Sequence, residues 1–504
     1  MMELLHSLYL GFSVALLPVN LLFCFVGVFL GTLVGVLPGL GPAATIALLL
    51  PITFSLRPES ALIMIAGIYY GAQYGGSTTS ILVNIPGEAS SVVTCLDGYQ
   101  MARRGRAGPA LGISAFGSFI GGTLSVVGLM LLGPVLARFA LHFGPPEYFA
   151  LMFLGIVILT FLSKGSMVKC FISAAVGLFV GTIGIDTIYG IQRFTYGTLT
   201  LMDGVGLVPV AMGLFGIAEV FVNLEQREIR DIFKTKIKGL LPTRKDWTES
   251  FGPIIRGSFI VFFLGMLPGG GTILASFASY ATEKRVSHHP ESFGNGAIAG
   301  VAGPETANNA ATGGAMIPLL SLGIPSNVIM ALLIGAMMIH GIKPSSFLVS
   351  EHPQVFWGII TSMYVGNIIL LVLNLPLIPI WVRILKVPYG ILFPLILLFC
   401  LIGVYTVNSN SYEILIMLIF GVIGYVMRKT GFEPAPLLFA MVIGPIMETA
   451  LRQSLLHSRG NFNIFFNRPI SAVLIGAAIL LLLSPLIPRV GRQRETIVKE
   501  AADD

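Results

Sequence analysis

Charged residues are scarce in this sequence: Asp, Glu, Lys and Arg make up 11% of its 504 residues, against about 25% in a soluble domain. Hydrophobic residues make up 55%, and apolar runs recur from Leu8 to Ile487. Because a membrane-spanning helix needs about 20 apolar residues, the sequence predicts an all-α polytopic membrane protein with about ten to twelve transmembrane helices, plus re-entrant or broken helices.

Cysteine is also rare. The four cysteines, Cys24, Cys95, Cys170 and Cys400, are scattered along the chain, and their spacing matches neither a metal-ligand motif nor a disulfide framework. The sequence has no Walker A loop, no HExxH zinc motif and no G-x-S-x-G elbow. These absences argue against ATP as the direct energy source and against an enzyme, and no cofactor or metal is assigned from motifs.

The net charge of +6 lies in loops and in the C-terminal tail. Positive-inside topology explains such an excess better than a nucleic-acid partner does. The basic residues in 97–108 therefore predict a cytoplasmic loop. The N-terminus lacks a basic n-region, so we do not expect a cleaved signal peptide. We predict an N-terminal transmembrane half (1–222), a cytoplasmic hydrophilic linker (223–252), a C-terminal transmembrane half (253–487) and a charged tail (488–504).

One polar stretch, residues 300–327, stands out between apolar flanks. Polar, glycine-rich sequence at membrane depth belongs where protein or a cavity lines it, because lipid satisfies no backbone group. Glu305, Asn308, Asn309 and Thr312 follow i, i+3, i+4, i+7 spacing, so a helix places all four on one face. We interpret this face as part of a solute or ion site.

A second polar stretch covers residues 70–90. Gln73, Ser77, Ser80 and Asn84 again keep three- and four-residue steps, and Pro86 with the following glycine ends the element. The apolar pieces before it, 43–54 and 58–70, are short. The first is too short to cross a membrane alone and predicts a half-helix or a tilted segment, and the second leads into the polar stretch.

The two stretches belong to an internal repeat. LPGLGP at 37–42 and LPGGGT at 267–272 are 230 residues apart, and the Gly-Gly pairs at 75–76 and 313–314 are 238 apart. Each copy runs from a glycine-rich break, through a polar face, to an Ile-Pro pair. Paired breaks in two halves are the sequence sign of a transporter site at a repeat interface. An odd number of crossings between the copies would invert the repeat, which is our expectation.

The breaks suit carboxylate binding, because a helix N-terminus carries about half a positive charge and glycine lets a ligand approach the backbone. Hydroxyls and amides nearby can orient a polyanion or coordinate a cation, with Na⁺ near Asn308 and Asn309 as one possibility. The candidate substrate- or ion-binding residues are Pro38, Gly39, Gly41, Gly75, Gly76, Ser77, Thr78, Thr79, Ser80, Asn84, Gly269, Gly270, Gly271, Thr272, Glu305, Asn308, Asn309, Thr312, Gly313, Gly314, Ser326 and Asn327.

Neither polar stretch contains a lysine or an arginine. A bound anion would then be neutralised by helix ends and by co-transported cations. Glu305 is the one acid of the second stretch, and an intramembrane carboxylate is a functional hypothesis by default. Two interpretations stay open for it: a proton or cation site, or a cap for a half-helix beside Pro304.

The motifs quoted above resemble a known family. LPGLGP, YGGSTTSILVNIPGEASSVVTCLDGYQMARRGRAGPAL, LPGGGT and GVAGPETANNAATGGAMIPLLSLGIP are similar to the large permease subunit of the tripartite tricarboxylate transporters. The resemblance covers nearly the whole chain. It implies a multi-pass permease of the bacterial cytoplasmic (inner) membrane, working with a small membrane subunit of about four helices and with a periplasmic solute-binding protein.

The resemblance also implies the transported solute, a tricarboxylate such as citrate or a related organic carboxylate, and a Na⁺ or H⁺ gradient as the driving force. The hypothesis is therefore ion-coupled secondary uptake by alternating access. The alternatives are a passive anion channel, a symporter for a different small carboxylate, and a membrane enzyme, for which no catalytic constellation is present.

Overall fold

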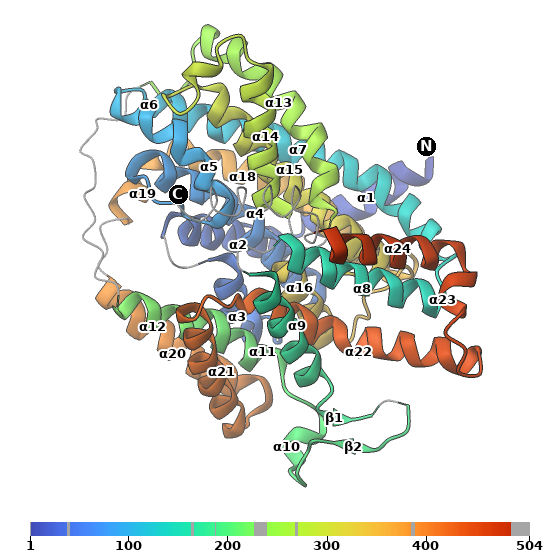
Figure 1. Ribbon diagram of the computed structural model, residues 1–504. Helices are drawn as coiled ribbons and strands as arrows, with labels where there is room; N and C mark the ends of the chain where they lie inside the picture. The colour runs from blue at the N-terminus through green and yellow to red at the C-terminus, as the bar shows by residue number, and fades with distance from the viewer. Residues whose placement is uncertain are drawn as a thin grey trace.

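The computed structural model describes residues 2–37, 41–162, 166–186, 188–225, 239–267, 271–384 and 389–484. These residues are overwhelmingly helical (Figure 1). Within them the one sheet consists of β1 (Gly184–Ile185) paired antiparallel with β2 (Gln192–Arg193). The prediction of an all-α fold is confirmed.

Five helices of the described residues are long and apolar enough to cross a membrane: α2 (Pro18–Val36), α7 (Ala107–Ala140), α18 (Pro353–Asn374), α21 (Ser411–Lys429) and α22 (Pro434–His457). Eight shorter apolar helices of 10–17 residues accompany them. The chain is a multi-pass membrane protein. Ten to twelve crossings, and the four sequence segments proposed above, stay predictions.

The remaining elements lie before or after residues 226–238, which belong to the predicted hydrophilic linker. Before it lie α1 (Met2–Ala15), α3 (Pro42–Thr53), α4 (Pro58–Val83), η1 (Ala89–Ser91), α5 (Val92–Thr94), η2 (Cys95–Tyr99), α6 (Gln100–Arg103), α8 (Pro145–Leu162), α9 (Met167–Gly181), α10 (Leu199–Met202), α11 (Leu207–Ala211), η3 (Met212–Ile217) and α12 (Ala218–Glu225). After it lie α13 (Arg244–Gly265), α14 (Gly271–Val286), η4 (Pro290–Ser292), α15 (Ala299–Leu322), α16 (Val328–Ile339), α17 (Leu348–Glu351), α19 (Ile378–Ile384), α20 (Tyr389–Asn408), α23 (Ile464–Asn467) and α24 (Pro469–Leu483).

The two polar stretches form long continuous helices. The apolar piece at 58–70 leads into the first stretch without a break, since α4 runs from Pro58 to Val83. Every residue from 60 to 82 is buried. Because the surrounding protein packs against this face, glycine and hydroxyl side chains at membrane depth do not need to break the helix. The prediction of a short helix at 43–54 agrees with the twelve residues of α3.

Glycines bring α2 against α4 in the first copy. A Cβ atom at Gly27 would overlap the carbonyl oxygen of Met64, and one at Gly35 would overlap that of Ala72. Small residues let membrane helices approach backbone to backbone in this way. The pair α2–α4 is therefore fixed along its length by positions where a side chain does not fit.

The second copy repeats these contacts between α13 and α15. A Cβ atom at Gly257 would lie 2.9 Å from the carbonyl oxygen of Gly303, and one at Gly265 would overlap that of Ala311. The glycines lie 230 residues after Gly27 and Gly35, and their partners lie 239 residues after those of the first copy. The copies thus share a packing pattern as well as a sequence motif.

Both polar helices also end alike. Asn84 caps α4 with φ 56°, and Gly323 caps α15 with φ 71°. An Ile-Pro pair follows each cap, at Pro86 and Pro325. Asparagine and glycine are the residues that tolerate this left-handed conformation, and proline prevents the helix from continuing. The matching ends define two rods of similar length, 26 and 24 residues.

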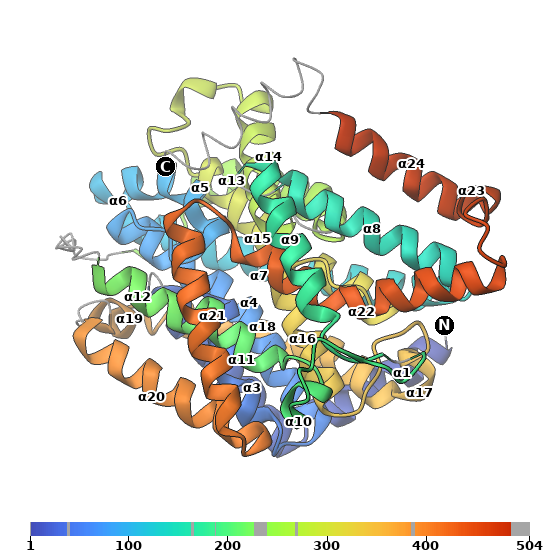
Figure 2. The same ribbon diagram turned by 60° about the horizontal axis from the view of Figure 1, so that its bottom comes forward.

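The largest apolar core surrounds α4 and α16, with Tyr69, Leu333 and Phe356 among its fully buried members. A unit of α8, α9, α22 and α24 packs beside this core (Figures 1 and 2). The strands β1 and β2 and helix α10 project from the molecule next to it, as Figure 1 shows. This places α4 and α15 in the interior, away from lipid.

Candidate functional site

A buried carboxylate joins the two copies. Ser77 of α4 donates a hydrogen bond to Oε2 of Glu305 of α15 over 2.5 Å, and the hydroxyl of Thr94 donates to Oε1. Ser118 of α7 lies 3.4 Å from the backbone oxygen of Glu305. The Glu305 side chain is 1% exposed. The acid of one copy is therefore solvated by hydroxyls of the other.

No basic side chain forms an ion pair with Glu305 in the part of the chain that the structure describes. A buried charge is costly unless it is paired or hydrogen-bonded. Hydroxyls reduce that cost without neutralising the charge, so the carboxylate can still take up a proton or a cation. The alternative of a helix cap does not fit, because α15 begins at Ala299, one and a half turns earlier, and the carboxylate bonds side chains instead of backbone N–H groups.

A second polar contact lies one helical turn further along α15. The Ser90 hydroxyl lies 2.7 Å from Oδ1 of Asn308, and the amide nitrogen of Asn308 donates to Oε1 of Glu88 over 3.1 Å. Gln73 of α4 completes the group. When its side-chain amide is oriented with the nitrogen facing Asn308 and Glu88, that nitrogen donates to Asn308 Oδ1 and to Glu88 Oε1, each over 2.7 Å. The sequence missed Glu88 and Ser90, whereas the candidate Asn308 and the periodic step at Gln73 pointed to this contact.

The order of these contacts gives the direction of the helices. Ser77 meets Glu305 near the start of α15, whereas the Tyr69 hydroxyl accepts a 3.0 Å hydrogen bond from Asn327, which follows the end of α15. The chain order along α4 is thus the reverse of that along α15. Because α4 and α15 are the equivalent helices of the two copies, this antiparallel order is the one that an inverted repeat would give, and the inversion itself stays a prediction.

The connection after α4 supplies the groups that the sequence did not predict. The Glu88 carboxylate accepts from the backbone of Ser90 and caps η1. The buried carboxylate of Asp97 accepts from the N–H groups of Gly296 and Ala297, over 2.7 and 2.8 Å, and from the Tyr280 hydroxyl over 2.9 Å. The connection after α4 is therefore held by these hydrogen bonds to the segment that leads into α15.

Asn327 marks a second region of candidate residues. Its side chain caps α16 by accepting from the N–H of Met330, and a Cβ atom at Gly271 would lie 3.8 Å from its amide nitrogen. Ser326 donates to the backbone oxygen of Ala315 over 3.2 Å. Gly271 is the first residue of α14, so the N-terminus after the second break lies beside Asn327 and close to α4.

Other candidates have packing or backbone roles. Thr79 and Ser80 bond the Gly76 carbonyl, Asn309 bonds that of Glu305, and Thr312 bonds that of Asn308. Gly75, Gly76, Gly313 and Gly314 allow close contact with neighbouring elements, Gly41 caps α3 and Thr272 lies in the first turn of α14. Asn84 is exposed at the end of α4 and joins neither group. Pro38, Gly39, Gly269 and Gly270 lie outside the described residues.

Comparison with known proteins settles the family. The profile of the "Tripartite tricarboxylate transporter TctA family" matches residues 21–439. The chain belongs to this family. A TctA-family chain is a transporter component, and the resemblance noted in the sequence is confirmed.

Two relatives come from Agrobacterium vitis. An uncharacterized 52.8 kDa protein in the TAR-I ttuC' 3' region is 50% identical over 500 residues, covering 99% of this chain and 100% of that protein. An uncharacterized protein in the TAR-II ttuC' 3' region is 47% identical over 237 residues, covering 47% of this chain and 98% of that protein. No solved structure matches this TctA-family chain.

The described residues leave little space at the polar site of this TctA-family chain. Two cavities there measure about 10 Å³ each, one lined by Ser77, Thr78 and Tyr74, the other by Asn309 and Thr312. Neither holds even one small carboxylate, because a single water already needs a cavity of about 10–15 Å³. These two cavities are therefore not a solute-binding space in this conformation.

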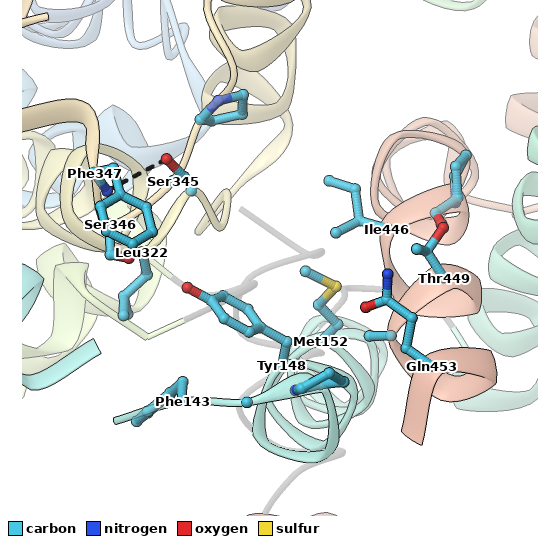
Figure 3. Close-up of a pocket in the computed structure, with 16 residues that line it drawn as sticks. Phe143, Tyr148, Met152, Leu322, Ser345, Ser346, Phe347, Ile446, Thr449 and Gln453 are labelled. Atoms are coloured by element: carbon cyan, nitrogen blue, oxygen red, sulfur yellow. Dashed lines mark hydrogen bonds between the residues drawn. The ribbon is translucent and has the colours of Figure 1, made fainter. Parts of the chain in front are cut away.

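A larger cavity of about 540 Å³ lies at the far end of α15, around Gly323. Figure 3 shows Tyr148 of α8 between the loop that holds Ser345 and the α22 side chains Thr449 and Gln453. Its lining is mostly apolar, with no charged side chain and none of the predicted site residues. This cavity is not the carboxylate site that the sequence predicted.

Proposed function

We propose that the chain is the large permease subunit of a binding-protein-dependent secondary transporter of a bacterial cytoplasmic membrane. It imports a tricarboxylate such as citrate, or a related organic carboxylate, together with Na⁺ or H⁺. Its partners are a small membrane subunit and a periplasmic solute-binding protein. Membership of the TctA family supports the transport role.

One observation carries the coupling mechanism: Glu305 of the second copy is held by Ser77 and Thr94 of the first copy. A proton or a sodium ion that neutralises this carboxylate changes the contact between the copies. Because the two cavities beside this contact measure about 10 Å³ each among the described residues, we expect the copies to part before solute reaches Glu305. Ion binding at Glu305 and separation of α4 from α15 are thus linked, as alternating access requires.

The carboxylate solute itself would bind at the helix ends after the two breaks. The N-termini of α3 and α14 begin beside Gly41 and at Gly271. Each carries about half a positive charge and free N–H groups. Asn327 next to Gly271 supplies an amide that can hydrogen-bond a second carboxylate group of the solute. A di- or tricarboxylate can engage both the helix end and the amide, which a monocarboxylate does not.

The test is reconstitution of the permease with the small subunit and the binding protein in liposomes. Labelled citrate and smaller carboxylates are offered under an imposed sodium gradient, an imposed proton gradient, or neither. We expect uptake that follows one of the gradients and that Asn327→Ala and Asn308→Ala reduce, with the variants present in the membrane at normal abundance. Uptake that ignores both gradients contradicts the coupling, and single-channel conductance without the binding protein would establish the passive channel instead.

A further inference from the structure

An apolar groove runs along the outer surface between α9 and α21, with α22 as its floor. Its volume is about 350 Å³, and its walls are Ile172 and Val176 of α9 and Val422, Ile423 and Val426 of α21. These five side chains are 37–54% exposed. Because α21 is one of the candidate membrane spans, this exposed surface faces the hydrocarbon part of the bilayer.

A cation closes one end of the groove. The ammonium of Lys169 donates to the backbone oxygen of Thr430 over 2.7 Å and lies 5.4 Å from the ring centre of Phe432. Both Thr430 and Phe432 line the groove. Lys169 forms no ion pair with a carboxylate within the described residues. An ammonium has three donors, so two remain for an anionic group at the mouth of the groove.

The neighbouring basic residues differ from Lys169. Arg428 pairs with Glu219, and Lys429 pairs with Glu225 over 2.5 Å. These charges and the basic segment after Glu225 assign this end of α21 to the cytoplasmic side by the positive-inside rule. Their carboxylate partners already balance them, so that, of these three basic residues, Lys169 is the one that an outside anion can use.

The length of the groove fits one leaflet. Its α21 wall runs from Thr430 to Val422, eight residue steps, which is about 12 Å of helix. Half of a hydrocarbon core of about 30 Å is about 15 Å. The groove therefore covers most of the cytoplasmic leaflet and stops near the middle of the bilayer. A partner helix that crosses the membrane would leave more than half of its length without this contact.

The chemistry of the walls also argues against a partner helix. Helices that pack in membranes present small residues to each other, as Gly27 and Gly35 do where α2 meets α4. The groove presents branched side chains, Val422, Ile423 and Val426. A flexible hydrocarbon chain fills such a surface without needing close backbone approach.

We propose that the groove between α9 and α21 binds an anionic phospholipid of the cytoplasmic leaflet, with one acyl chain in the groove and the headgroup phosphate on Lys169. The lipid seals the boundary between the unit of α8, α9, α22 and α24 and the helix pair α20–α21. A free phosphate ion would leave the apolar groove empty, and a hydrocarbon chain alone would leave Lys169 without an anion. A phospholipid uses both, because the cation lies at the end of the groove.

The test uses the purified full-length chain in detergent, with phosphatidylglycerol or phosphatidylcholine of the same acyl chains, and native mass spectrometry to count bound lipids. Lys169→Gln should lower phosphatidylglycerol affinity about fivefold, the effect expected for one lysine at an anionic surface, and leave phosphatidylcholine unchanged. Val422→Trp should lower binding of both lipids by filling the groove. Lys245→Gln, an exposed lysine of the same side away from the groove, should change neither.

Equal phosphatidylglycerol binding by wild type and Lys169→Gln overturns the headgroup assignment, and unchanged lipid binding by Val422→Trp overturns the groove. Both substitutions are at surface positions, and elution as one sharp peak in size-exclusion chromatography confirms that each variant is folded. A photo-crosslinker in place of Val422 in native membranes distinguishes the occupants. We expect a lipid adduct, and a polypeptide adduct as the main product would refute the proposal.

Discussion

Glu305 and Asp186 are both buried acids, yet the protein holds them by opposite means. Glu305 receives hydrogen bonds from two hydroxyls, of Ser77 and Thr94. Asp186, in the connection between α9 and α10, has Arg452 at 2.5 Å and Arg193 at 3.6 Å, both measured to its Oδ2. One acid is solvated without a countercharge, and the other is paired twice.

Backbone hydrogen bonds and ion pairing both favour the charged form of Asp186. The backbone N–H of Tyr189 and the Arg452 guanidinium lower its pKa from 3.8 to about 2. An acid that is always charged and always neutralised by its neighbours acts as a structural tie, here between the β1–β2 hairpin and α22. The hydroxyls of Ser77 and Thr94 leave Glu305 open to a proton or a cation. The difference supports the proposal that Glu305, and not Asp186, takes part in transport.

The largest effect that we expect comes from exchanging the two carboxylates for amides. Glu305→Gln should lower gradient-driven uptake about hundredfold, because it weakens two hydrogen bonds to a charged group, each worth about 1.5–3 kcal/mol. Asp186→Asn should lower the melting temperature and keep uptake dependent on the gradient. Uptake into proteoliposomes and thermal unfolding of both variants make the comparison. Equal loss of coupled uptake in both would erase the distinction between the acids.

Removing one hydroxyl at a time should have a smaller effect. Ser77→Ala and Thr94→Ala are each expected to lower coupled uptake about tenfold, since each deletes one hydrogen bond to the charged carboxylate. Ser77→Thr and Thr94→Ser keep a hydroxyl and serve as controls. The concentration of Na⁺, or the pH, at half-maximal uptake should shift in the alanine variants. A shift in neither would mean that the hydroxyls only fill space around Glu305.

Substitutions where α2 packs against α4 should lower uptake less than they lower the stability of the fold. Gly35→Ala forces α2 away from Ala72 of α4 and should destabilise the fold by about 1–3 kcal/mol, the usual cost of overpacking. Gly476→Ala is the matched control, because α24 leaves open space around that position. Its melting temperature should stay the same or rise. If both variants unfold alike, the close approach of α2 and α4 does not position Ser77.

The smallest effect concerns acid sensitivity of the hairpin. The pKa of Asp186 is lower in the folded protein, at about 2, than its ordinary value of 3.8. Its stabilising contribution is therefore complete above about pH 4 and is lost as the pH falls through 2. Pepsin cleavage within residues 184–199 should increase between pH 4 and pH 2 in the wild type. Asp186→Asn should be cleaved readily already at pH 4. Identical cleavage profiles of the wild type and the variant would show that Asp186 does not hold the β1–β2 hairpin to α22.

The sequence predicted the parts of the site that repeat along a helix. The spacing of Glu305, Asn308 and Asn309 placed them on one face, and the matching motifs located the equivalent helix α4. Ser77 was a candidate, but nothing in its surroundings indicated that its partner lies 228 residues away. Contacts between the copies depend on how α4 and α15 cross, which no local pattern encodes.

Thr94, Ser90 and Glu88 were missed for a different reason. They follow the helix end, where the chain turns through η1 and α5 back toward α15. Periodicity carries no information about such a return. Asn84 was overvalued because it continued the periodic pattern of Gln73, Ser77 and Ser80, whereas its left-handed conformation ends the helix and turns it outward. A helical period is informative only up to the cap.

The backbone contacts of Gly27 and Gly35 against Met64 and Ala72 also have a consequence for how this sequence can change over time. On one side of α4 the polar face can exchange one hydroxyl or amide for another and so acquire a different solute. On the opposite side any side chain larger than hydrogen on α2 pushes the two helices apart. Substitutions that survive should therefore collect on one half of the α4 surface, and a saturation library would show the boundary as a stripe along the helix.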